Sequence, residues 1–184
     1  KQRYQIREML SFIQYITEDF HTKWKHKEPK KAVEQYVKVF GTPDETGKDF
    51  AKWNNIANIG GPTIIKDEEI SHKEPVKHID FIYSTRAIRV PADKVGVLAK
   101  SSGSIMVDQL KGEVTARCHY LIKNAVTLGF VDDVVADKIP DDKARNEYAK
   151  RIKNNITPDW FDDPLDEYKK TLSVDVAHHL EINK

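Results

Sequence analysis

The sequence predicts an α+β protein that is mostly helical, in which an N-terminal helical unit precedes a small mixed domain. Apolar residues recur every three or four positions along most of the chain, which is the period of an amphipathic helix. A short segment around residue 80 instead alternates apolar and polar residues, as strands do. The chain has 184 residues, 39% of them hydrophobic, which suffices for one core with attached arms.

Three amphipathic helices are expected in the N-terminal unit, residues 1–60. They cover residues 4–25, 29–40 and 45–58. In each of them the apolar side chains fall on one face. Gly41 ends the second helix, because glycine accepts the left-handed conformation that often follows a helix.

A linker and a pair of strands follow. Residues 61–78 open with glycine and proline and are then polar and charged, which predicts a surface loop or linker. Apolar residues alternate over 79–83 and resume at 88–90, which predicts a hairpin that turns at Ser84 and Thr85. These strands begin the mixed domain.

The rest of the mixed domain, residues 79–156, is expected to be mainly helical. Helices are predicted over 91–100 and 141–155, and a short apolar helix or strand over 105–111. The most regular helix covers 113–128, and its apolar stripe repeats every four and three positions. The stripe consists of Val114, Cys118, Leu121, Ala125 and Leu128.

The C-terminal tail, residues 157–184, is acidic and aromatic. Trp160, Phe161 and Leu165 stand among carboxylates, a composition that suits docking into a basic, apolar groove of a protein partner. The alternative is that the two aromatic rings pack back onto the parent domain. Alternation over 174–180 predicts an edge strand.

Composition and charge exclude several classes of protein. The 30 basic and 29 acidic residues give a net charge of +1, which excludes a strongly basic nucleic-acid coat and a strongly acidic mimic. The single cysteine, Cys118, cannot form an intrachain disulfide, which favours a reducing, cytoplasmic location. No apolar run is long enough for a membrane span, and the charged start of the chain does not predict a signal peptide.

Residues 92–131 resemble the winged helix-turn-helix DNA-binding family. A short helix, a Ser-Gly connector, a second short element and a longer helix follow in order. The stretch Ala125–Val131 corresponds to the family's usual helix end, except that Ala125 stands where leucine is usual. The resemblance implies that the longer helix enters the major groove of duplex DNA. This sequence departs from the family at the expected basic wing, which holds Asp132 and Asp133.

A helix over 113–128 with its stripe inward would present a set of polar side chains outward. Basic members would neutralise phosphates, and the others would bond sugars, phosphates or base edges. The predicted DNA-binding residues are Lys111, Arg117, His119, Tyr120, Lys123, Asn124 and Thr127. The alternative is an ordinary core helix.

Catalytic and metal-binding signals are weak. The histidines are scattered, and none shows the spacing of metal ligands. Cys118 lies on the apolar stripe, so we expect it in the core. His78 and Asp80 are two positions apart on a predicted strand, so their side chains share a face. The alternative to a non-catalytic role is that they form an acid–base pair. We expect no cofactor, no bound metal and no catalysis.

The sequence therefore predicts a non-enzymatic binding or regulatory module that contacts duplex DNA. The alternative is a protein-interaction or assembly component, and the lysine-rich composition fits a phage or virus.

Overall fold

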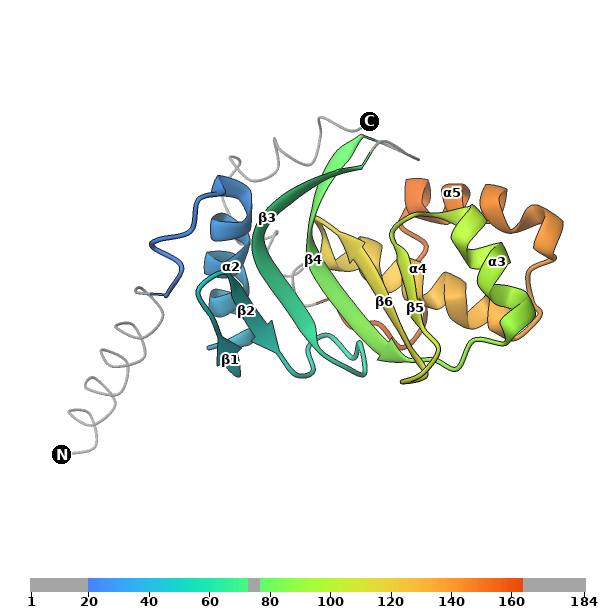
Figure 1. Ribbon diagram of the computed structural model, residues 1–184, viewed down its shortest axis with the longest axis horizontal. Helices are drawn as coiled ribbons and strands as arrows, with labels where there is room; N and C mark the ends of the chain where they lie inside the picture. Colours follow the sequence, from blue (N-terminus) through green and yellow to red (C-terminus); the bar gives the residue numbers. More distant parts are fainter. Residues whose placement is uncertain (1–19, 73–76, 164–184) are drawn as a thin grey trace.

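A computed structural model describes residues 20–72 and 77–163, and shows them folded around one antiparallel sheet (Figure 1). The predicted first helix lies mostly outside these residues, as do Leu165 and the predicted strand over 174–180. Within them, none of the helices is long and apolar enough to cross a membrane.

The sheet has six strands in the order β1-β2-β3-β4-β6-β5, and every neighbouring pair is antiparallel. The strands are β1 (Glu45–Thr46), β2 (Phe50–Trp53), β3 (Thr63–His72), β4 (His78–Ala87), β5 (Ile105–Asp108) and β6 (Glu113–Cys118). The chain leaves β4 for the far edge, forms β5, and returns as β6 between them. Segments from the predicted N-terminal unit, linker and mixed domain thus join one sheet.

The helices pack against this sheet and against one another. They are α2 (Lys27–Phe40), α3 (Ala92–Ser101), α4 (Leu121–Val135) and α5 (Ala144–Asn154), with a short 3-10 turn, η1 (Asp141–Lys143). α2 contacts β3, while α4 runs behind β4 and β6 in Figure 1. α3 and α5 pack onto α4. α4 is therefore the central helix of the core.

Three helix predictions are confirmed, but the expectation of a mostly helical protein is wrong. α2, α3 and α5 match the helices predicted over 29–40, 91–100 and 141–155. The helix predicted over 45–58 is instead the hairpin of β1 and β2. Phe50 and Trp53 are three positions apart, which suggested a helix, but burial alternates along β2 so that Ala51 and Trp53 face the core.

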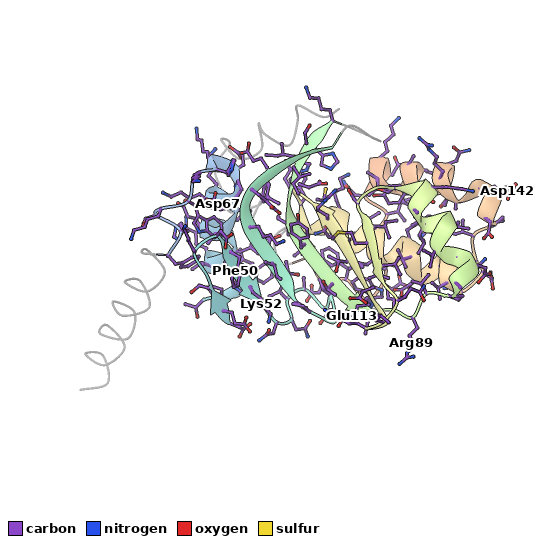
Figure 2. All side chains as sticks on the ribbon, in the orientation of Figure 1. Phe50, Lys52, Asp67, Arg89, Glu113 and Asp142 are labelled. Atoms are coloured by element: carbon purple, nitrogen blue, oxygen red, sulfur yellow. The ribbon has the colours of Figure 1, made fainter. Side chains whose placement is uncertain are left out.

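The predicted linker and the predicted hairpin turn are also wrong. β3 occupies most of 61–78, and β4 runs unbroken through Ser84 and Thr85. The charges of β3 have tertiary partners: Asp67, labelled in Figure 2, accepts hydrogen bonds from the backbone amides of Lys25 and His26 at 2.7 and 2.8 Å. Polar residues can lie within a strand when their polar groups have hydrogen-bond partners elsewhere in the fold.

The helix predicted over 113–128 is wrong as well, and the winged-helix interpretation falls with it. The first part of that segment is β6, whose residues are alternately half-buried and buried, with Glu113 at the lower end of the sheet in Figure 2. The second part belongs to α4, which continues through Gly129 to Val135. An antiparallel six-stranded sheet has no counterpart in a three-helix DNA-binding unit.

The segment after α5 packs back onto the body of the protein. Trp160 Nε1 donates to Asp132 Oδ2 at 3.1 Å, and the guanidinium of Arg86 lies 4.1 Å from the centre of the Trp160 ring. Trp160 and Phe161 are half-buried and pack against the core cluster. This arrangement corresponds to the alternative in which the two rings contact the parent domain. We call residues 156–163 the strap.

Replacing Gly129 by alanine is expected to destabilise the fold by about 1–3 kcal/mol, although alanine favours helices. A Cβ at this position would lie 2.8–3.1 Å from three ring atoms of Pro158 in the strap. Because the proline ring is rigid, the strap must move away, and the indole N–H signal of Trp160 should shift in an NMR spectrum.

Gly96 in α3 is the matched control, because a Cβ there meets nothing within 4 Å. Gly96→Ala should stabilise the protein by about 0.5–1 kcal/mol. Equal stabilisation by both alanines in urea denaturation would contradict the packing of the strap on α4.

Candidate metal centre

A thiol and two imidazoles meet where β4 begins and β6 ends. His78 is the first residue of β4, Cys118 is the last of β6, and His119 lies in the two-residue connection to α4. The ladder between the two strands stops at the pair Ile82 and Cys118. The backbone therefore brings together residues that are 40 positions apart in the sequence.

The distances within this cluster suit a tetrahedral metal ion. Cys118 Sγ lies 3.7 Å from His78 Nε2 and 3.6 Å from His119 Nδ1. All three atoms lie within 4.8 Å of one another. Zinc bonds of about 2.3 Å to sulfur and 2.1 Å to nitrogen, at a tetrahedral angle, place the two donors about 3.6 Å apart. The two sulfur–nitrogen distances therefore match the edges of a zinc tetrahedron.

A buried carboxylate orients the cluster. Asp80 is fully buried, and its Oδ1 lies 2.9 Å from His78 Nε2. Its other oxygen, Oδ2, accepts from Arg117 Nε at 3.1 Å and from Ser104 Oγ at 3.3 Å. The contact between His78 and Asp80 agrees with the expectation that they share a strand face. Asp80 thereby ties β4 to β6 and to the residue before β5.

The second imidazole is held in its neutral form. Burial, reinforced by the nearby His78, lowers the pKa of His119 from 6.5 to about 4. The ring lies against Tyr120 with 3.8 Å between the two centroids, and the two ring planes are tilted by 49°. Neutral imidazole is the form that ligates metals, so His119 is already a competent ligand at neutral pH.

The same geometry does not suit a thiol nucleophile. A catalytic base must accept the thiol proton while a third group orients its other nitrogen. Here His78 turns one nitrogen, Nε2, toward both the thiol and Asp80. His119, with a pKa of about 4, is a weak base at neutral pH. The cluster therefore fits metal coordination better than proton transfer.

The predicted DNA-binding residues do not lie on one outer helix face. Lys111 is in the exposed hairpin turn, and Arg117 is on β6 and paired with Asp80. Asn124 and Thr127 are 0% and 2% exposed. The three others are half-buried around the start of α4: His119, Tyr120 and Lys123. Lys123 Nζ donates to the Ile152 carbonyl of α5.

Few local patterns in the sequence indicate this cluster. Cys118 was expected in the core and is indeed buried, but at the end of a strand. A strand over residues 113–118 that pairs antiparallel with β4 brings Cys118 and His119, at its end, close to His78 at the start of β4. Comparisons with protein-family models, with curated proteins and with solved structures find no match to this chain.

Proposed function

We propose that this protein binds one divalent transition metal ion, with zinc as the preferred metal, through His78, Cys118 and His119. The observation that carries the proposal is the pair of sulfur–nitrogen distances, 3.6 and 3.7 Å, at the edge lengths of a zinc tetrahedron. The protein works by binding and not by catalysis. The ligand is thus a metal ion in place of the duplex DNA expected from the sequence.

The donor types select the class of metal. A thiolate with two imidazoles suits zinc and its neighbours among the transition metals, whereas magnesium and calcium require oxygen ligands. Cys118 must lose its proton to bind, so binding releases protons and weakens as the pH falls. Copper is the main competitor for such a donor set, and a parallel titration with a copper salt ranks the two metals.

The experiment is a zinc titration of the reduced, chelator-treated full chain against a coloured chelator, with thermal unfolding followed in parallel. We expect one ion per chain and a higher Tm, because a ligand at 100 times its Kd adds about 2.7 kcal/mol of stability. Magnesium should have no effect. A chain that takes up no zinc would overturn the proposal.

Two variants test the assignment of ligands. Cys118→Ser and His119→Gln should each weaken zinc binding by more than about 100-fold, since even the loss of an outer partner of a ligand costs about 10–100-fold. His26→Gln is the control, because His26 lies in the loop before α2 and its side chain is 37% exposed. If all three variants bind zinc like the parent, the ion sits elsewhere.

A further inference from the structure

We infer that the bound metal ion keeps its fourth coordination position for an exogenous ligand, and that this ligand is a small anion that binds through sulfur or nitrogen. The inference rests on the proposed metal binding and adds the class of molecule that the centre recognises. Zinc with three protein ligands takes its fourth ligand from water or a substrate, whereas structural zinc sites have four protein ligands.

The donor set of the candidate metal centre leaves one position for such a ligand. The donor atoms of His78, Cys118 and His119 lie within 4.8 Å of one another, and within residues 20–72 and 77–163 no fourth histidine, cysteine or carboxylate joins this group. The nearby Asp80 carboxylate accepts from Arg117 Nε at 3.1 Å and balances that guanidinium. Three ligands fill three corners of a tetrahedron, so one corner is left for a molecule from solution.

The burial of the three ligands limits the size of that molecule. Cys118 is 7% exposed, whereas the side chain of His78 is 13% exposed and His119 is half-buried. Solvent therefore reaches the centre past the imidazoles and not past the sulfur. Such limited exposure favours a ligand of only a few atoms.

The charges around the centre favour an anion. The thiolate cancels one of the two charges of the ion, and Arg117 cancels the charge of Asp80. Lys123 adds a positive charge close to His119: burial is the main reason why the pKa of His119 is low, and Lys123 lowers that pKa further. The loaded centre is therefore positive, and a partly buried positive site attracts anions more strongly than the same charge in water. Among anions, zinc favours those that bind through nitrogen or sulfur.

The test uses the full chain loaded with Co²⁺ in place of zinc, because the visible spectrum of Co²⁺ reports its coordination, and azide is the probe. Azide should shift the bands of the parent protein along a saturable curve that fits one azide per ion. Perchlorate has the same charge but coordinates metals poorly, so it should leave the spectrum unchanged at the same concentration. An equal response to both anions would overturn the inference.

Two lysine variants test the role of charge. Lys123→Met should weaken azide binding roughly fivefold while Co²⁺ stays bound. Lys111→Met is the matched control, because the Lys111 side chain is 70% exposed in the turn before β6, at the opposite end of this strand from Cys118. Equal azide affinities in the two variants would contradict the electrostatic selection of an anion.

The outcomes separate this inference from the proposed function. A parent protein that binds Co²⁺ through Cys118 but whose spectrum does not respond to azide has no open position, and the inference is then wrong while the proposed function stands. If the parent binds neither Co²⁺ nor zinc, the proposed function itself fails. Both results come from the parent protein, so they decide the question even if Lys123→Met does not fold.

Discussion

Changing Asn124 to aspartate is expected to lower the free energy of unfolding by roughly 4–7 kcal/mol at pH 7, the cost of a carboxyl pKa raised by burial. Asn124 is 0% exposed, and its Nδ2 donates to the Ile82 carbonyl at 3.0 Å and to Ser84 Oγ at 3.1 Å. Aspartate has the same shape, but ionised it cannot donate and it brings a charge into the core. Urea denaturation measures the loss.

The pH dependence identifies the cause. Burial should raise the pKa of the new carboxyl in the folded state above its unfolded value of about 3.9. The variant should therefore regain stability as the pH falls from 8 toward 4, because protons then bind the folded state more tightly than the unfolded state. The parent carries no carboxyl at this position, so it should not show this recovery.

Asn155→Asp is the matched control, since Asn155 is exposed at the end of α5. A surface change of this kind should alter stability by about 0.5 kcal/mol or less. If Asn124→Asp is as mild as this control, Asn124 faces solvent, as the DNA-binding interpretation required.

Some elements were predictable because their signals are local. α2, α3 and α5 each have a polar outer face and a Pro or Gly near an end, and both signals act within one helix. The sequence predicts β6 and the first part of α4 as one helix because Val114 and Cys118 are four positions apart. Residues at this spacing lie on one face of a helix and also on one face of a strand. Ala116, buried between them, completes the period of two.

β3 could not be recognised locally because its polar residues depend on distant partners. Lys66 Nζ lies 4.3 Å from the centre of the Tyr83 ring on β4, and Glu68 accepts a 2.5 Å hydrogen bond from the hydroxyl of the same tyrosine. α4 was equally hidden, since burial on most of its sides removes the polar face that marks an amphipathic helix. Both elements are defined by tertiary packing.

The candidate metal centre was predictable only in part. Alternation along a strand was enough to place His78 and Asp80 together. The approach of Cys118 and His119 follows from the pairing of β4 with β6, which no local pattern indicates. The full cluster could not be predicted because it depends on the pairing of two strands that are distant in the sequence.

Replacing Asp80 by alanine should destabilise the metal-free protein by about 3–5 kcal/mol, the usual cost of removing one partner of a buried ion pair. The Arg117 side chain is only 20% exposed and would lose its carboxylate, while Ser104 would lose an acceptor. Urea denaturation in the presence of a chelator measures this cost without any contribution from a bound ion.

A double variant shows whether the destabilisation by Asp80→Ala comes from the Arg117 guanidinium that is left without its carboxylate. Arg117→Met alone leaves Asp80 buried without its guanidinium, so it should also be destabilising. Combined with Asp80→Ala it removes both charges, and the loss should fall short of the sum of the single losses by about 1 kcal/mol or more. Additive losses would mean that the two side chains act independently. A loss below about 1 kcal/mol for Asp80→Ala alone would mean that the carboxylate does not hold β4 to β6.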